Sequence, residues 1–158
     1  MNPQFLEALL NADHVNLYGD PALDLDADLE RISALKPRLD GLLSAHFSLV
    51  PPDHFQDGTA LAGLVIWEAI QPTHEGKAGS CQYAALDFRF SNFGHLFTCL
   101  PEYAQLAYDP DALQHAIDLI THEGFRFIPA QSLSEPYSGS HREFRRFTWL
   151  ERYFADSL

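Results

Sequence analysis

Residues 80–100, SCQYAALDFRFSNFGHLFTCL, decide the fold. Apolar side chains occupy every second position in the first half of this stretch, at Ala84, Leu86, Phe88 and Phe90. A period of two predicts a strand with one buried face, so residues 80–91 are expected to form a strand. The sequence Ser91-Asn-Phe-Gly94 then predicts a tight turn, and residues 95–100 predict the next strand. The stretch therefore predicts two antiparallel strands that share a buried face.

Two further segments extend this pair. Residues 61–71 are rich in strand-forming residues, and they are separated from residues 80–91 by PTHEGKAG, which has the composition of a loop. Residues 125–129, FRFIP, predict a further strand. The segments together predict an antiparallel β-meander of about four strands.

Three Asx-Pro pairs predict helix starts, at residues 2–3, 20–21 and 109–110. The Asn or Asp side chain accepts from the free N–H groups of a first turn, and proline is pre-set for the first helical position. Apolar residues with helical spacing follow each pair; after residue 21 they are Leu25, Leu29, Ile32, Leu35 and Leu39. Pro37 is expected to end or kink this second helix. The third helix is expected over residues 110–123, with Gly124 as its C-terminal cap.

The rest of the chain completes an α+β domain. Residues 130–141 are polar, and residues 144–154 form an amphipathic stretch that predicts a final helix. A chain of 158 residues is typical of one domain, and 46% apolar residues supply one core. No repeat or linker divides the sequence. We therefore expect residues 1–158 to form one α+β domain, a meander packed with N-terminal, central and C-terminal helices.

The composition excludes several classes of protein. The chain has 22 acidic and 10 basic residues, whereas nucleic-acid binding leaves a basic footprint and anionic membranes repel negative charge. The longest nearly apolar stretch, residues 60–70, is about half the length that spans a bilayer, and the N-terminus lacks the features of a signal peptide. Two cysteines give no disulfide scaffold. A cytoplasmic protein that binds neither nucleic acid nor membrane is expected.

The acidic residues are concentrated at the start of the second helix. Five carboxylates lie within eleven residues: Asp20, Asp24, Asp26, Asp28 and Glu30. Helix capping and the helix dipole account for one or two of them. The surplus predicts a negative surface that attracts a basic partner protein and raises its association rate. The alternative is a solvated surface without a partner.

Residues 141–146, HREFRR, form the one basic cluster of the sequence. Its three arginines could hold an anion such as phosphate. Because the chain has more than twice as many acidic as basic residues, we favour the alternative that these arginines pair with carboxylates of the same surface.

Two sets of residues are candidate metal ligands or nucleophiles. His115, Asp118 and His122 share one face of the third helix, but two helical turns separate the imidazoles by roughly 10 Å, too far for one metal ion. Cys81 or Cys99 would need an activating histidine, for which His95 is the candidate near Cys99. A cysteine in an apolar strand is more often a small core residue.

Asp53 and His54 form an adjacent acid and base in a loop, where neighbouring side chains seldom face each other. The sequence contains no nucleotide-binding loop and no hydrolase motif. It therefore predicts no catalytic residue, no metal site and no cofactor.

The segments GFRFIP (residues 124–129) and TWLERYF (residues 148–154) resemble the ending of uncharacterised bacterial proteins. In size, acidity, aromatic-rich strands and lack of catalytic motifs, the chain also resembles the immunity proteins that bacteria encode beside toxins. This resemblance implies direct binding that neutralises a basic toxin, with aromatic anchors such as Tyr18 or Trp67. It assigns no functional residue by position and gives no oligomeric state.

Two alternatives to an immunity protein come from other classes. One is a small enzyme whose site is assembled from dispersed residues such as His54, His95 and Cys99. The other is an acidic mimic of DNA phosphates, which needs a long negative surface and is disfavoured by the basic residues near the C-terminus.

Overall fold

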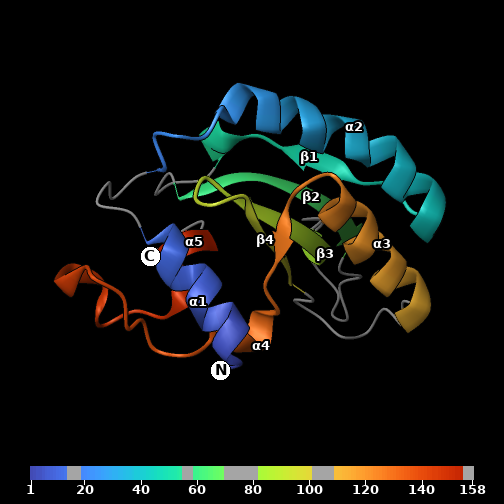
Figure 1. Cartoon of the computed structure of the whole chain (residues 1–158). Coiled ribbons are helices and arrows are strands. Elements are labelled where there is room, and N and C mark those ends of the chain that lie inside the picture. Colours follow the sequence, from blue (N-terminus) through green and yellow to red (C-terminus); the bar gives the residue numbers. More distant parts are fainter. Residues whose placement is uncertain (14–18, 55–58, 70–81, 101–108, 155–158) are drawn as a thin grey trace, which may run out of the picture.

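The fold is given by a computed structural model that describes residues 1–13, 19–54, 59–69, 82–100 and 109–154. In these residues five α-helices accompany one five-stranded sheet of order β1-β2-β3-β4-β5, and helices lie on both sides of the sheet (Figure 1). The expected α+β class is confirmed. No helix in these residues is both long and apolar enough to cross a membrane.

The sheet is antiparallel except at one edge. The strands β1 (Ser48–Val50), β2 (Ala60–Ala69), β3 (Gln82–Ser91) and β4 (Leu96–Leu100) pair antiparallel in sequence order. β5 (Arg126–Phe127) pairs parallel with β4, so the last predicted strand is present but does not continue the antiparallel meander. The chain reaches β5 through a helix, which is the usual way to bring a strand back parallel. The short strand β1 was not predicted.

Helix α2 (Leu25–Leu43) begins and ends later than its sequence pattern predicts. Asp20 does not cap it: the Asp20 side chain accepts from the Ala22 amide at 2.9 Å, but residues 21–24 form a turn and the helix starts only at Leu25. Asp24 is the N-cap and accepts from the Ala27 amide at 3.1 Å. The helix continues through Pro37. The apolar residues before and after this proline share one buried face, and their burial offsets the lost hydrogen bond: Ile32, Leu35 and Leu39.

The other helices follow their capping signals. Asn2 and Asp109 cap α1 (Pro3–Ala12) and α3 (Pro110–His122), as predicted from the Asx-Pro pairs. Gly124 adopts a left-handed φ of +94° directly after the end of α3, which confirms its predicted role. A short helix, α4 (Ala130–Leu133), lies in the polar segment of residues 130–141, for which no helix was predicted.

The final helix is shorter than its amphipathic pattern predicts. A 3-10 turn, η2 (Arg142–Phe144), precedes α5 (Trp149–Phe154). Glu151 Oε2 accepts from the Thr148 amide at 2.6 Å, and Thr148 Oγ1 accepts from the Glu151 amide at 3.3 Å. This reciprocal pair is a capping box, and it fixes the helix start at Trp149. A second 3-10 turn, η1 (Pro52–His54), follows β1.

Two apolar clusters lie on opposite faces of the sheet. The β4 neighbours Leu96 and Phe97 point to opposite sides and belong to different clusters. The larger cluster lies beneath α2 and α3 and includes Ile32, Leu39, Leu64, Phe88, Phe90, Ile117 and Ile120. The smaller cluster joins α1, α4 and α5 and includes Leu9, Phe93, Leu133, Trp149 and Tyr153. The two ends of the chain therefore form one layer, and the middle helices form the other (Figure 1).

The turn between β3 and β4 packs closely against α1. Gly94 adopts a left-handed φ of +55°, and a Cβ at this position would lie 2.9 Å from the Ala12 Cβ. Position 94 therefore requires glycine for its backbone conformation and for space.

Replacing Gly94 with alanine is expected to destabilise the fold by roughly 1–3 kcal/mol, because the new Cβ meets α1 at a strained φ. The matched control is G41A, since Gly41 lies in α2 with nothing within 4 Å of an added Cβ. That control is expected to stabilise the protein by roughly 1 kcal/mol through helix propensity. Urea unfolding measures both, and a G94A protein as stable as wild type would contradict the close approach.

Candidate functional site

The carboxylates predicted to bind a partner lie at the start of α2. Asp24, Asp26 and Glu30 are exposed, and Asp20 is partly buried in the preceding turn. Within the described part of the chain, none of these four forms an ion pair with Lys, Arg or His. We refer to these four residues as the acidic surface of α2.

Asp28, the fifth predicted carboxylate, is buried, with 2% of its side chain exposed. Its Oδ1 accepts from Arg31 Nη2, and its Oδ2 accepts from His95 Nδ1 at 3.0 Å. Asp28 lies one helical turn before Ile32, the first residue of the buried stripe of α2. The spacing of one helical turn from Ile32 distinguishes Asp28 from the exposed carboxylates in the sequence. Asp28 therefore belongs to an internal cluster and not to the acidic surface.

Arg31 connects this carboxylate to the end of α3. Its Nη1 donates to the Glu123 carbonyl oxygen at 2.8 Å, and its guanidinium lies 4.9 Å from the centre of the Phe125 ring. The contact satisfies a carbonyl at a helix C-terminus and places a positive charge there, where the helix dipole favours it. Asp28, Arg31 and His95 form what we term the Asp28 cluster, in which the Arg31 and His95 side chains are each 37% exposed.

His95 is held in an unfavourable backbone conformation. Its φ is +52°, directly after the left-handed Gly94, and such a conformation costs a non-glycine residue roughly 1–3 kcal/mol. The His95 carbonyl accepts from the Arg126 amide at 2.8 Å and so begins the contact between β4 and β5. Strained non-glycine residues concentrate at functional sites. The Asp28 cluster is therefore a candidate site as well as a link between elements.

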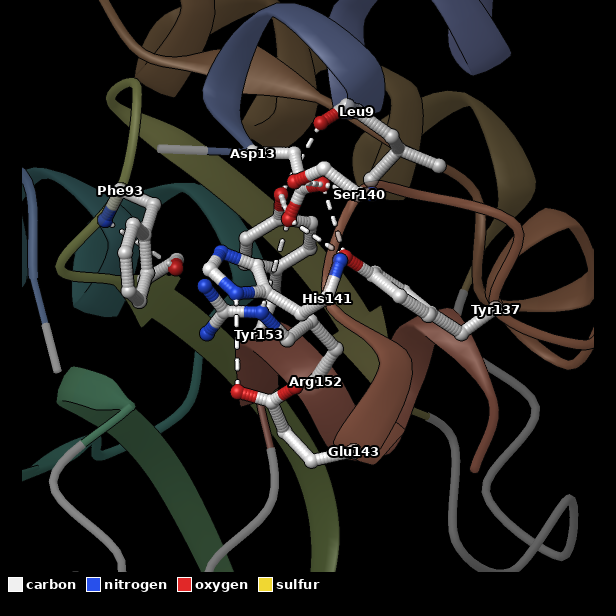
Figure 2. Close-up of polar contacts among 10 residues, drawn as sticks. Leu9, Asp13, Phe93, Tyr137, Ser140, His141, Glu143, Arg152 and Tyr153 are labelled. Carbon is white, nitrogen blue, oxygen red and sulfur yellow. Dashed lines mark hydrogen bonds and ion pairs between the residues drawn. The ribbon is translucent and has the colours of Figure 1, made fainter. Parts of the chain in front are cut away.

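A second buried carboxylate, Asp13, lies after α1 in the other layer, as Figure 2 shows. Its two oxygens accept from the Tyr137 hydroxyl at 2.8 and 2.7 Å. Its Oδ2 also accepts from the Ser140 amide at 2.7 Å and the Ser140 hydroxyl at 2.9 Å. Its Oδ1 lies 3.7 Å from Arg152 Nε and 3.4 Å from the Tyr153 hydroxyl. This Asp13 cluster fastens the end of α1 to the C-terminal part of the chain.

Arg152 balances the charge of Asp13 inside this layer. Its side chain is fully buried, and its guanidinium lies 4.4 Å from the centre of the Phe93 ring and 4.7 Å from that of Phe144. A buried guanidinium is tolerated only with a counter-ion and further favourable contacts, which Asp13 and the aromatic rings supply here.

The ionisation of the Asp13 cluster favours a structural role. Burial alone would raise the pKa of Asp13, but hydrogen bonds from Ser140 and Tyr137 and the charge of Arg152 hold it below its ordinary value of 3.8. Burial, together with the charge of Asp13, raises the pKa of Tyr137 to about 12. The carboxylate is thus a weaker base than usual and the phenol a weaker acid, which suits a fixed hydrogen bond better than proton transfer.

A third buried pair, Asp87 and Arg89, ties β3 to α5. Arg89 Nε donates to Asp87 Oδ2 at 2.8 Å, and Arg89 Nη1 donates to the Phe154 carbonyl at 3.1 Å. Burial and the nearby charge of Asp87 raise the pKa of Cys99 to about 12. A buried thiol with this pKa is protonated at neutral pH, so Cys99 does not have the properties of a nucleophile. His95, considered as its activating base, contacts Asp28 instead.

The other candidate residues stay apart from these clusters. His115, Asp118 and His122 are exposed on α3, and Asp118 accepts from the Gln114 amide group at 2.9 Å. Among the residues described here, no three His, Cys, Asp or Glu side chains are placed to hold a metal ion.

The predictions for the loop and anchor residues have mixed outcomes. Contrary to expectation, His54 Nδ1 and Asp53 Oδ1 do contact each other, at 3.1 Å, although both side chains are largely exposed. Trp67 is 44% exposed on β2. Cys81 and Tyr18 lie outside the described residues.

The arginines of residues 141–146 do not form the ion pairs that the sequence predicts. Arg142, Arg145 and Arg146 are exposed, and none of them forms an ion pair with a carboxylate of the described residues. Arg146 lies over the Phe147 ring, 4.7 Å from its centre. The expectation that these arginines pair with carboxylates of the same surface is therefore wrong for this part of the chain.

The Asp13 cluster predicts that Tyr137→Phe destabilises the fold by roughly 1–3 kcal/mol, because the buried Asp13 carboxylate loses one of its donors. The matched control is S134A, whose hydroxyl is exposed and donates to the nearby Gln131 carbonyl. This control is expected to change stability by less than about 0.5 kcal/mol. Urea unfolding compares the two variants, and equal losses would show that the Tyr137 hydroxyl has no special role.

The lowered pKa of Asp13 predicts how stability depends on pH. The folded state keeps Asp13 ionised at lower pH than the unfolded chain does, so this stabilisation is present above pH 3.8 and is lost as pH falls through the folded pKa. The stability difference between wild type and D13N should therefore shrink in acid. Unfolding at a series of pH values measures it, and a constant difference would refute the coupling.

Comparison with protein-family models, with curated proteins and with solved structures found no match to this chain. Functional conclusions about it therefore rest on its own residues.

Proposed function

We propose that this chain is an acidic binding protein, of the immunity-protein kind, that neutralises a basic protein by direct contact through the acidic surface of α2. The observation that carries this proposal is the contrast between the exposed carboxylates of α2, which have no cationic partner in the described residues, and the buried ones, which do.

The distribution of ion pairs supports this interpretation. Among the described residues, five lysine and arginine side chains contact carboxylates; the pairs are Arg31–Asp28, Lys36–Asp40, Arg38–Glu123, Arg89–Asp87 and Arg152–Asp13. The carboxylates of the acidic surface are left out of these pairs. A partner that binds them breaks no internal ion pair, so the charge attraction is not offset by the loss of one.

The acidic surface is also rigid, which favours binding. Asp24 is fixed by its bond to the Ala27 amide, and Asp26 and Glu30 project from a helix whose opposite face is in the core. A preordered surface loses little conformational entropy when a partner binds. Its negative field also steers a cationic protein toward it and raises the association rate.

The cellular setting follows from the type of protein. An immunity protein that meets a delivered toxin inside a bacterium would act in the cytoplasm, and it needs affinity but no chemistry. Trp67, exposed on β2, is a candidate aromatic anchor.

A small enzyme is the second candidate function. The observation that favours it is the contact of His95 with the buried carboxylate of Asp28. Neither His54 nor Cys99 adds to that site: Cys99 is buried, and His54 contacts Asp53.

The binding proposal predicts that D24N/D26K/E30K weakens binding of a basic toxin encoded beside this chain by at least about tenfold, mainly through slower association. Asn at position 24 keeps the helix cap. Because lysine at position 26 opposes the helix dipole, thermal unfolding checks that the variant is folded before its binding is compared. Binding kinetics by surface plasmon resonance at low and high salt measure the effect.

The matched control is E7Q/D53K/D118K, which changes the net charge by the same amount at exposed positions elsewhere. We expect this control to retain most of the affinity. If the two triple variants bind equally well, net charge and not the α2 surface drives association. If wild type does not bind the toxin, the immunity role is refuted.

A further inference from the structure

His95 differs from the other described histidines in the kind of carboxylate that it contacts. The carboxylate side chains of Asp53, Glu143 and Asp40, beside His54, His141 and His46, are 80%, 54% and 21% exposed, so water weakens these contacts. Asp28, beside His95, is 2% exposed. A buried carboxylate holds an imidazole in one orientation far more firmly than a solvated one, because water does not compete for the hydrogen bond.

The contact with Asp28 fixes which ring nitrogen of His95 carries the proton. An ionised carboxylate only accepts, so Nδ1 must donate to Asp28 Oδ2 across the 3.0 Å contact. In the neutral ring Nε2 then carries the lone pair. Because Nδ1 faces a buried group while 37% of the side chain is exposed, we place Nε2 on the solvent side of the ring. A carboxylate that orients a histidine in this way is the arrangement of base and orienting acid in hydrolases.

Arg31 lies beside this imidazole and donates to the same carboxylate. Its Nη2 lies 3.4 Å from His95 Nδ1, and both groups donate to the same carboxylate. One N–H of Arg31 is used for Asp28 and one for the Glu123 carbonyl. Arg31 is also held over the Phe125 ring, so it fixes the Asp28 carboxylate beside the imidazole.

The backbone is shaped to place this ring. Gly94 and His95 are consecutive left-handed residues, and glycine would adopt this conformation more readily than histidine at position 95. Across the cluster, a Cβ on the left-handed Gly124 would lie 3.1 Å from Arg31 Nη1. The chain thus adopts left-handed conformations at the two points that bring His95 and Arg31 together.

We propose that His95 is the nucleophile of an acyl-transfer site for small carboxylic esters, with Asp28 and Arg31 as its positioning residues. His95 Nε2 attacks the carbonyl carbon, the bond to the leaving oxygen breaks, and the acyl group is transferred to the ring. Water then attacks the acyl-imidazole and takes the acyl group as a carboxylic acid. The leaving oxygen receives a proton from water, so one ester and one water give one acid and one alcohol. The carboxylate of Asp28 stabilises the positive charge on the acylated ring.

The experiment measures hydrolysis of p-nitrophenyl acetate by the full chain. Wild type is expected to exceed H95N by at least about tenfold in the protein-dependent rate. Asparagine tolerates the left-handed backbone, so this variant should fold, which thermal unfolding checks. The matched control is H115N, which removes an exposed histidine that has no carboxylate partner among the described residues and should leave the rate unchanged. Equal rates for H95N and wild type would overturn the proposal.

A spectroscopic readout tests the role of Asp28 without relying on activity. The 15N chemical shifts of the neutral His95 ring in the wild-type protein should report a protonated Nδ1 and an unprotonated Nε2. In D28N this preference should weaken and the hydrolysis rate should fall. A wild-type ring protonated on Nε2 alone would overturn the proposal even if the variants fold poorly.

This activity and the binding role use different residues and can fail separately. D24N/D26K/E30K should retain hydrolysis of p-nitrophenyl acetate, because it leaves the Asp28 cluster intact. Conversely, H95N should retain binding of a basic partner.

Discussion

The buried carboxylate of Asp28 is the interaction on which one half of this molecule depends. Through Arg31 it holds the end of α3, and through His95 it holds the turn between β3 and β4. Removing a carboxylate from water costs several kcal/mol, which only well-placed partners can offset. The three elements must therefore meet at one point, and α2 and α3 are fixed over their face of the sheet.

The buried carboxylate of Asp13 links the elements of the other layer of the molecule. It joins α1 to Tyr137 and Arg152, so the two ends of the chain close into one layer. The protein thus uses two kinds of acidic residue. In the described segments, buried carboxylates each have a cation or several donors, whereas the exposed carboxylates of α2 have neither a cation among those residues nor a structural need beyond helix capping. The exposed carboxylates of α2 are therefore available to contact another molecule.

Local signals in the sequence account for most of the fold. Alternation of apolar residues predicted the central strands, and the pairs at Asn2 and Asp109 predicted two helix starts. The same signal failed at Asp20, because the chain forms a turn over residues 21–24 and Asp24 caps α2 instead. The parallel pairing of β5 could not be predicted, since it depends on how the chain returns through α3 and not on the composition of the strand itself.

The candidate sites were less predictable because their partners are far apart in sequence. Asp28 and His95 are separated by 67 positions, and Asp13 and Tyr137 by 124; no spacing rule links such residues. One part was accessible: helical periodicity places Asp28 on the side of Ile32 and away from Asp26 and Glu30. A run of carboxylates on a helix is therefore not one surface. Successive residues turn by about 100°, so the same acidic segment supplies both a buried orienting group and an exposed charged surface.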